Sequence, residues 1–162
     1  MASETGKPAR RRGAEVTTPA ELLAAPGFVA RRLYQSYVAL WTRVVDPVLT
    51  GPQFAVLTAV SRYPGVGQGS LAASVALDRS TMADIVRRLE DNGLIVRRTA
   101  VLDGRRKLLY LTDDGERRLD EVNRRARKLE EDLMRGRSAA GREEWIREMT
   151  AMATHWENLL ND

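Results

Sequence analysis

The chain has 162 residues, of which 43% are apolar and 30% charged, a composition typical of one globular domain with an apolar core. No apolar run approaches the roughly 18 residues of a membrane span. The first 27 residues carry charges and lack the apolar centre of a secretory signal. We therefore expect a cytoplasmic protein without membrane partners. Cysteine is absent, which excludes disulfides, thiolate metal sites and cysteine nucleophiles.

Enzyme chemistry finds little support in this composition. His155 is the single histidine, so a two-histidine metal site is excluded. No nucleophile–base pair and no cofactor motif accompanies the carboxylates, and the glycine-rich stretch 65–70 lacks the lysine of a phosphate-binding loop. We interpret this stretch as a connection between helices, and we expect no enzyme activity, no cofactor and no metal.

The first 27 residues predict an arm and a short helix. Residues 1–16 are small and polar with a basic cluster at 10–12, which predicts a disordered basic arm. Residues 17–27 predict a short N-terminal helix, in which Thr18 is the cap and Glu21 completes a capping box.

A long helix is predicted from Phe28 to about Asp46, because its apolar residues recur on two neighbouring faces. This pattern indicates burial on two sides. Pro47 marks its end. The next helix begins with Thr50 as cap and Pro52 in its first turn.

A helix-turn-helix and a hairpin follow. Residues 69–77 predict a short helix, and Asp78 can cap a second helix over about 79–92. Residues 94–99 and 107–112 predict two strands that flank the turn dipeptide Asp103-Gly104. The fold class is therefore mainly α with a small β-wing (α+β), a winged helix-turn-helix.

Two further helices close the chain. Thr112 caps the first, and residues 136–138 separate it from the second. Apolar residues in both recur at heptad spacings, so each has a seam that needs a partner helix. We expect a homodimer. The predicted organisation is a dimerisation region at 28–49 and 113–162 around a winged helix-turn-helix DNA-binding lobe at 50–112.

The positive charge is concentrated in the wing. Between residues 97 and 107 five basic residues oppose one acid, and 5 − 1 = +4 equals the net charge of the chain. A cationic hairpin tip suits the DNA backbone and minor groove. The candidate DNA contacts in the wing are Arg97, Arg98, Asp103, Arg105, Arg106 and Lys107.

The helix that Asp78 begins is the candidate recognition helix, because its apolar stripe leaves a polar face outward. Residues in its first turn can meet phosphates and base edges. Asp84 either pairs with Arg88 or reads a cytosine amino group. The candidate contacts on this helix are Arg79, Ser80, Thr81, Asp84, Arg87 and Arg88.

These residues occur in a recognisable order: 52–57 (PQFAVL), 77–81 (LDRST), 88–95 (RLEDNGLI), 103–106 (DGRR) and 111–112 (LT). In this the chain resembles the MarR family of winged helix-turn-helix transcriptional regulators, over roughly residues 28–160. The resemblance implies a triangular homodimer on a pseudo-palindromic operator in double-stranded DNA. It also implies that Arg105 enters the minor groove and that Asp103 orients an arginine such as Arg79. Ala83 and Asp84 depart from the polar or basic pair common in the family.

The family usually senses small, often aromatic and anionic ligands, where the DNA-binding lobe meets the dimerisation helices. Arg31, Tyr34, Tyr37 and Trp41 follow at steps of 3, 3 and 4 residues, so they share a broad helix face. A guanidinium and three rings suit an aromatic carboxylate, although these residues can equally line the core and the dimer seam. The expected function is a ligand-responsive regulator, most often a repressor in such families; the alternative is a ligand-blind DNA-binding or architectural protein.

Overall fold

A computed structural model describes residues 17–100 and 107–160. It contains helices and a three-stranded antiparallel sheet, which confirms the mainly helical fold with a small β-wing. The chain divides into two compact units, residues 1–37 and 38–162. The predicted arm at 1–16 lies outside the described residues. The boundaries assigned to the dimerisation region and the DNA-binding lobe stay predictions.

The first unit contains α1 (Ala20–Leu23) and the start of α2 (Pro26–Leu40). The predicted cap at Thr18 is wrong: Pro19 is the N-cap residue, and its side chain forms no capping hydrogen bond. α2 begins two residues before Phe28, because proline is well suited to a first helical turn. None of its side chains is buried within the single chain, so the predicted burial on two sides is not found there.

α2 continues into a π-helix, η1 (Trp41–Val45). The amide of Asp46 donates to the carbonyl of Trp41, five residues earlier, at 3.0 Å. Single π-turns of this kind are rare and often occur at functional sites. The extended backbone of Asp46 then ends the helix immediately before Pro47, as predicted.

The three helices of the helix-turn-helix are α3 (Gly51–Arg62), α4 (Gln68–Ser74) and α5 (Arg79–Asp91). The predicted cap of α3 is confirmed: the Thr50 hydroxyl accepts from the amide of Gln53, whose side chain accepts from the amide of Thr50. Four side chains on one side of α5 are buried against the core, namely Met82, Ile85, Val86 and Leu89.

The sheet consists of β1 (Val66–Gly67), β2 (Ile95–Thr99) and β3 (Lys107–Leu111), in the order β1-β3-β2. β2 and β3 confirm the predicted hairpin. β1 was missed, because two residues in a glycine-rich connection carry no alternating pattern. It pairs Val66 with Leu109 of β3 and so ties the α3–α4 connection to the wing.

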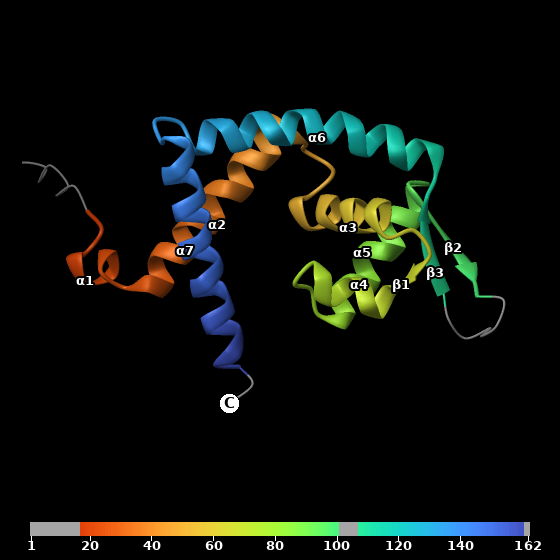
Figure 1. Ribbon diagram of the computed structural model, residues 1–162, viewed down its shortest axis with the longest axis horizontal. Coiled ribbons are helices and arrows are strands. Elements are labelled where there is room, and N and C mark those ends of the chain that lie inside the picture. The colour runs from red at the N-terminus through yellow and green to blue at the C-terminus, as the bar shows by residue number, and fades with distance from the viewer. Residues whose placement is uncertain (1–16, 101–106, 161–162) are drawn as a thin grey trace, which may run out of the picture. The chain divides into compact units, whose positions relative to one another are not determined.

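α6 (Asp113–Leu133) and α7 (Ala139–Asn158) complete the chain, and Thr112 and Ser138 cap them. The seam of α6 is largely buried within its own chain, where α6 contacts η1, α3 and β3. α6 therefore finds its predicted partner helices, η1 and α3, within its own chain. α7 begins at the end of α6 that is remote from the sheet (Figure 1). None of the side chains of α7 is buried.

Gly115 determines how closely α6 approaches the base of the wing. A Cβ atom at this position would lie 2.0 Å from the carbonyl oxygen of Leu94, so only glycine fits. The same carbonyl accepts from the amide of Thr112 at 3.1 Å, and the Thr112 hydroxyl donates to the carbonyl of Gly93 at 2.6 Å. The wing is therefore fastened to the first turn of α6.

Candidate nucleic-acid interface

The outward face of α5 is polar and largely cationic. Because Met82, Ile85, Val86 and Leu89 hold one side of the helix in the core, the residues between them point to solvent. All six predicted contacts on this helix are exposed: Arg79, Ser80, Thr81, Asp84, Arg87 and Arg88. An exposed helix with this charge can meet the phosphates and base edges of a major groove.

Asp78 organises the start of α5. Its Oδ1 accepts from the amide of Thr81 at 2.8 Å and from the Ser80 hydroxyl at 2.5 Å, and its Oδ2 accepts from the Thr81 hydroxyl at 2.6 Å. These bonds, first from Ser80 and then from Thr81, hold the pKa of the Asp78 carboxyl far below its usual range. The sequence identified Asp78 as a cap but did not predict that it binds both hydroxyls.

Asp84 forms an ion pair on the exposed face of α5. Its Oδ1 lies 2.9 Å from Nη2 of Arg87, three residues later, and not beside Arg88 as the i+4 spacing indicated. Both side chains are more than half exposed. A pair this exposed is weak, so it lowers the local charge of Arg87 without removing that residue as a phosphate contact.

A second ion pair joins the helix to the wing. Glu90 of α5 accepts from Nε of Arg97 in β2 at 2.7 Å and also from its Nη2. The hydrogen bond from Arg97 lowers the pKa of the Glu90 carboxyl and raises that of the guanidinium. Arg97, one of the predicted DNA contacts, is thus engaged within the protein.

The remaining predicted wing residues fall into two groups. The guanidinium of Arg98 lies 4.7 Å from the ring centre of Tyr110, a distance at which a cation and an aromatic ring attract one another. Lys107 is exposed and donates to the Thr99 hydroxyl at 2.7 Å across the hairpin. The other wing candidates, Asp103, Arg105 and Arg106, lie outside the described residues.

The predicted ligand-binding residues are divided between the two units. Arg31, Tyr34 and Tyr37 belong to the first unit and Trp41 to the second. Arg31 is exposed and its guanidinium lies 5.1 Å from the ring centre of Phe28. Tyr34 is 63% exposed and Tyr37 is half-buried.

Trp41 lies in the core of the second unit. It is buried, its indole N–H donates to the carbonyl of Leu49 at 2.7 Å, and its ring centre is 5.2 Å from that of Phe54. It therefore fixes the end of η1 against the start of α3.

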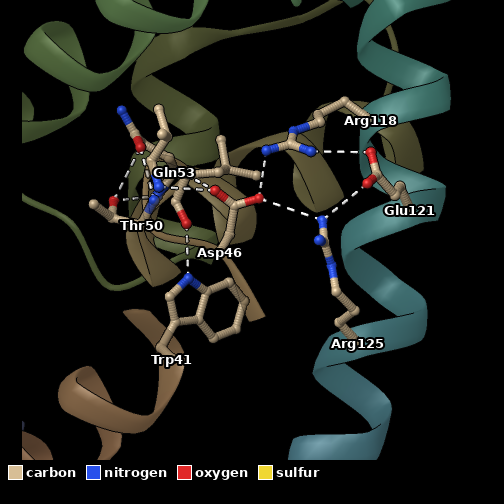
Figure 2. Close-up of polar contacts among 9 residues, drawn as sticks. Trp41, Asp46, Thr50, Gln53, Arg118, Glu121 and Arg125 are labelled. Carbon is tan, nitrogen blue, oxygen red and sulfur yellow. Dashed lines mark hydrogen bonds and ion pairs between the residues drawn. The ribbon is translucent and has the colours of Figure 1, made fainter. Parts of the chain in front are cut away.

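A buried ionic cluster around Asp46 was missed in the sequence. Oδ1 of Asp46 accepts from the amides of Val48 and Leu49 at 2.9 and 2.7 Å, and Oδ2 accepts from Arg118 and, at 3.5 Å, from Arg125. Figure 2 shows the carboxylate between the start of α3 and the two arginines of α6.

Glu121 contacts both of these arginines, at 2.9 Å from Arg118 and 3.2 Å from Arg125. The Nε atom of Arg125 is buried without a hydrogen-bond partner, so Arg125 is the less completely satisfied of the two. The only sequence signal for this cluster is an aspartate between an apolar helix and Pro47, and nothing in that pattern identifies partners more than 70 residues away.

Within residues 17–100 and 107–160, no group of three or more histidine or acidic side chains is arranged to hold a metal ion. No helix in these ranges is long and apolar enough to cross a membrane.

Comparison with known proteins finds a matching family and several similar transcriptional regulators. The MarR family profile matches residues 49–107. The transcriptional regulator HosA of Escherichia coli is 36% identical over 87 residues, which are 54% of this chain and 64% of HosA. The match with this relative thus spans less than two thirds of its length.

Solved structures extend the likeness over most of the chain. The transcriptional regulator PcaV from Streptomyces coelicolor, in complex with its natural ligand, has a TM-score of 0.81 at 34% identity, covering 85% of this chain and 98% of PcaV. BpsR of Bordetella bronchiseptica, whose DNA binding is regulated by 6-hydroxynicotinic acid, has a TM-score of 0.70 at 26% identity, covering 78% of this chain and 97% of BpsR. The family match, the shared winged fold and the identity to PcaV together show that this chain belongs to the MarR family.

Proposed function

We propose that the protein is a dimeric regulator that binds double-stranded DNA at a pseudo-palindromic operator. The observation that carries this proposal is the polar surface of α5, on which Arg79, Arg87 and Arg88 are exposed while the buried stripe holds the helix in the core. A rigid helix of this kind fits the major groove and can read base edges there. BpsR, a relative with the same fold, binds DNA, which supports this function.

In this proposal the wing lies in the flanking minor groove. Arg98 and Lys107 are exposed on its two strands, and Arg105 and Arg106 lie between these strands in the sequence. Cations at these positions displace counterions from the phosphates and so contribute affinity that depends on salt. Arg105→Ala is expected to weaken binding to all sequences and to reduce the salt dependence.

The dimer is proposed to form through residues 28–49 and 113–162. The observation that favours it is the C-terminal segment, where an apolar row is exposed from Ile146 in α7 to Leu160 just beyond this helix. Uncovered apolar area of this kind marks an interface, and a two-fold dimer would match a two-fold operator. Half-sites would then lie about one helical turn apart.

Selection of bound duplexes from a random pool, at physiological salt, tests this function. The expected product is an inverted repeat with a spacing near one helical turn. A variant with Arg79 and Arg88 both changed to alanine should fold normally and enrich no sequence. Enrichment of no motif by the wild-type protein would contradict the proposed function.

We further propose that a small aromatic acid releases the DNA. Arg31 offers a guanidinium for a carboxylate, and Tyr34 and Tyr37 offer rings for an aromatic body, whereas the buried Trp41 supports the end of the helix from within the core. Two relatives support this: PcaV was solved with a natural ligand, and an aromatic acid regulates the DNA binding of BpsR. The protein would act as a repressor that the ligand removes from its operator.

Ligand coupling of this kind is typically worth about 1–3 kcal/mol, or roughly a five- to 150-fold loss of DNA affinity. Titration of hydroxybenzoates and hydroxynicotinates into the wild-type protein and Arg31→Ala measures it. Weaker binding by Arg31→Ala is expected. Equal affinity would remove Arg31 as the carboxylate partner, and an absence of both binding and release would favour the ligand-blind alternative.

A further inference from the structure

The hydroxyl groups of Ser80 and Thr81 have their protons directed into the protein. Each hydroxyl carries one proton, and the two protons are donated to Asp78, at 2.5 Å from Ser80 and 2.6 Å from Thr81. What remains on each oxygen is lone pairs. All three side chains are exposed on the α5 surface proposed to face DNA.

Asp78 accepts hydrogen bonds and offers none. Its Oδ1 also binds the amide of Thr81 at 2.8 Å, and its pKa is held far below the ordinary range by these bonds. The carboxylate therefore stays ionised at physiological pH, when it is an acceptor only. As long as the Asp78 carboxylate is ionised, the hydroxyl groups of Ser80 and Thr81 donate their protons to Asp78 and can only accept hydrogen bonds from any other group.

Release of either hydroxyl would be unfavourable at a DNA surface. If Thr81 turned away, the described contacts would leave Oδ2 of Asp78 without a donor. A carboxylate oxygen that lacks both water and a donor is costly, and nearby phosphates would raise that cost by repulsion. The hydroxyl protons are thus held on Asp78 most firmly when the interface is closed.

Phosphate oxygens, guanine O6 and N7, and thymine O4 are acceptors, whereas adenine N6 and cytosine N4 present donors in the major groove. Hydroxyl groups that can only accept discriminate between these two classes. On the proposed function as its basis, we infer that Asp78 is a specificity-determining positioning residue: it directs Ser80 and Thr81 to read the amino groups of adenine or cytosine. The arginines of α5 then serve the acceptor groups and the phosphates.

The variant Asp78→Asn isolates this effect. Asparagine caps helices about as well as aspartate, so the fold and the hydrogen bond from the backbone amide of Thr81 are retained. Its NH₂ group donates to one hydroxyl, which frees that hydroxyl proton to point outward. Asp91→Asn is the matched control, because it removes one exposed carboxylate from the last turn of the same helix and should raise affinity for all duplexes alike.

The test uses the duplex that the wild-type protein selects, and analogues in which single adenines become purine or single cytosines become pyrimidin-2-one. Both analogues lack the amino group. For the wild type and Asp91→Asn, at least one such change in each half-site should weaken binding by about fivefold, the effect of one net hydrogen bond. Ser80→Ala or Thr81→Val should abolish that sensitivity at the position concerned.

Asp78→Asn should lose the same sensitivity and, in a fresh selection, favour guanine or thymine there. An Asp78→Asn selection identical to that of the wild type would overturn the inference and leave the proposed function intact, as would a wild type indifferent to every amino group. A wild type that selects no sequence at all would overturn both.

Discussion

Arg118 of α6 donates to the buried carboxylate of Asp46, which precedes it by 72 residues. The side chain of Asp46 is 1% exposed, and its other oxygen accepts from the amides of Val48 and Leu49. The carboxylate thus links the connection that enters α3 to the helix that leaves the wing (Figure 2).

Loss of the Arg118 guanidinium should therefore destabilise the fold. Arg118→Met keeps an apolar stem but leaves the more distant Arg125 as the one charged partner of Asp46 among the described residues. A buried charge stripped of its main partner costs about 2 kcal/mol or more. Denaturant titration at one protein concentration measures the change.

Arg135→Met is the control, because the pair that Arg135 forms with Asp132 is largely exposed. The effect of this substitution on the free energy of unfolding should stay within about 0.5 kcal/mol. Equal effects would show that the Asp46 cluster does not stabilise the fold.

The Glu90–Arg97 pair predicts a specific dependence on pH. The pKa of Glu90 is lowered from 4.5 in the folded state, so the pair adds stability above the unfolded pKa. That stability is lost as the pH falls below about 4.5 and through the folded pKa. Because the pair is about one-third exposed, the gain should be at most about 1 kcal/mol.

Thermal melts of the wild type and Glu90→Gln between pH 3 and 7 test this dependence. The wild type should melt at the higher temperature near pH 7, and the two curves should converge at the acidic end. A gap that is constant across this range would mean that the charge of Glu90 is not responsible.

The contact between Gly115 and Leu94 predicts opposite results for two glycine substitutions. Gly115→Ala places a methyl group on the carbonyl of Leu94 and should cost about 1–3 kcal/mol through forced displacement of the backbone. Gly69→Ala, in α4, meets no atom within 4 Å and should be neutral or stabilising by up to about 1 kcal/mol. The free energies of unfolding of both variants test this prediction. If Gly115→Ala were as stable as the wild type, position 115 would not lie against the carbonyl group of Leu94.

Local signals in the sequence predicted most of the fold. The cap at Thr50, the cap and apolar stripe of α5 and the turn dipeptide of the wing depend on residues at most a few positions apart. Such short-range chemistry can be read directly from the chain. β1 was missed because its partner, β3, lies more than 40 residues away.

Side-chain pairing was harder to predict than helices. Asp84 has arginines at both i+3 and i+4, and the sequence does not distinguish them; the structure selects Arg87. Asp46 finds its partners only once α6 is placed beside α3, so its cluster needs the tertiary fold. Asp78 was predicted as a cap, but its bonds to two hydroxyls depend on rotamers that no spacing specifies.

The salt dependence of DNA binding should separate the arginines of α5. Arg79→Ala and Arg88→Ala should each lower the slope of log affinity against log salt by about 1, as loss of one phosphate contact does. Arg87→Ala should lower it by less, because Asp84 already neutralises part of its charge. Fluorescence anisotropy over roughly 50 to 300 mM salt gives the slopes. Arg147→Ala on α7 is the control, and an equal loss of slope there would place the DNA elsewhere.

The dimer interface can be tested by two substitutions that introduce the same charge at different depths. Leu129 of α6 is 4% exposed, whereas Trp156 of α7 is 38% exposed in the single chain. Leu129→Glu buries an unpaired carboxylate in the core and should unfold the protein. Trp156→Glu leaves the core intact and should instead separate the protomers, because the charge enters only the apolar face that the partner covers.

Sedimentation and circular dichroism at micromolar concentration should show a folded monomer for Trp156→Glu, with weakened binding to the paired half-sites. A folded wild-type monomer at that concentration, or a Trp156→Glu variant that remains a dimer, would show that α7 does not form the interface.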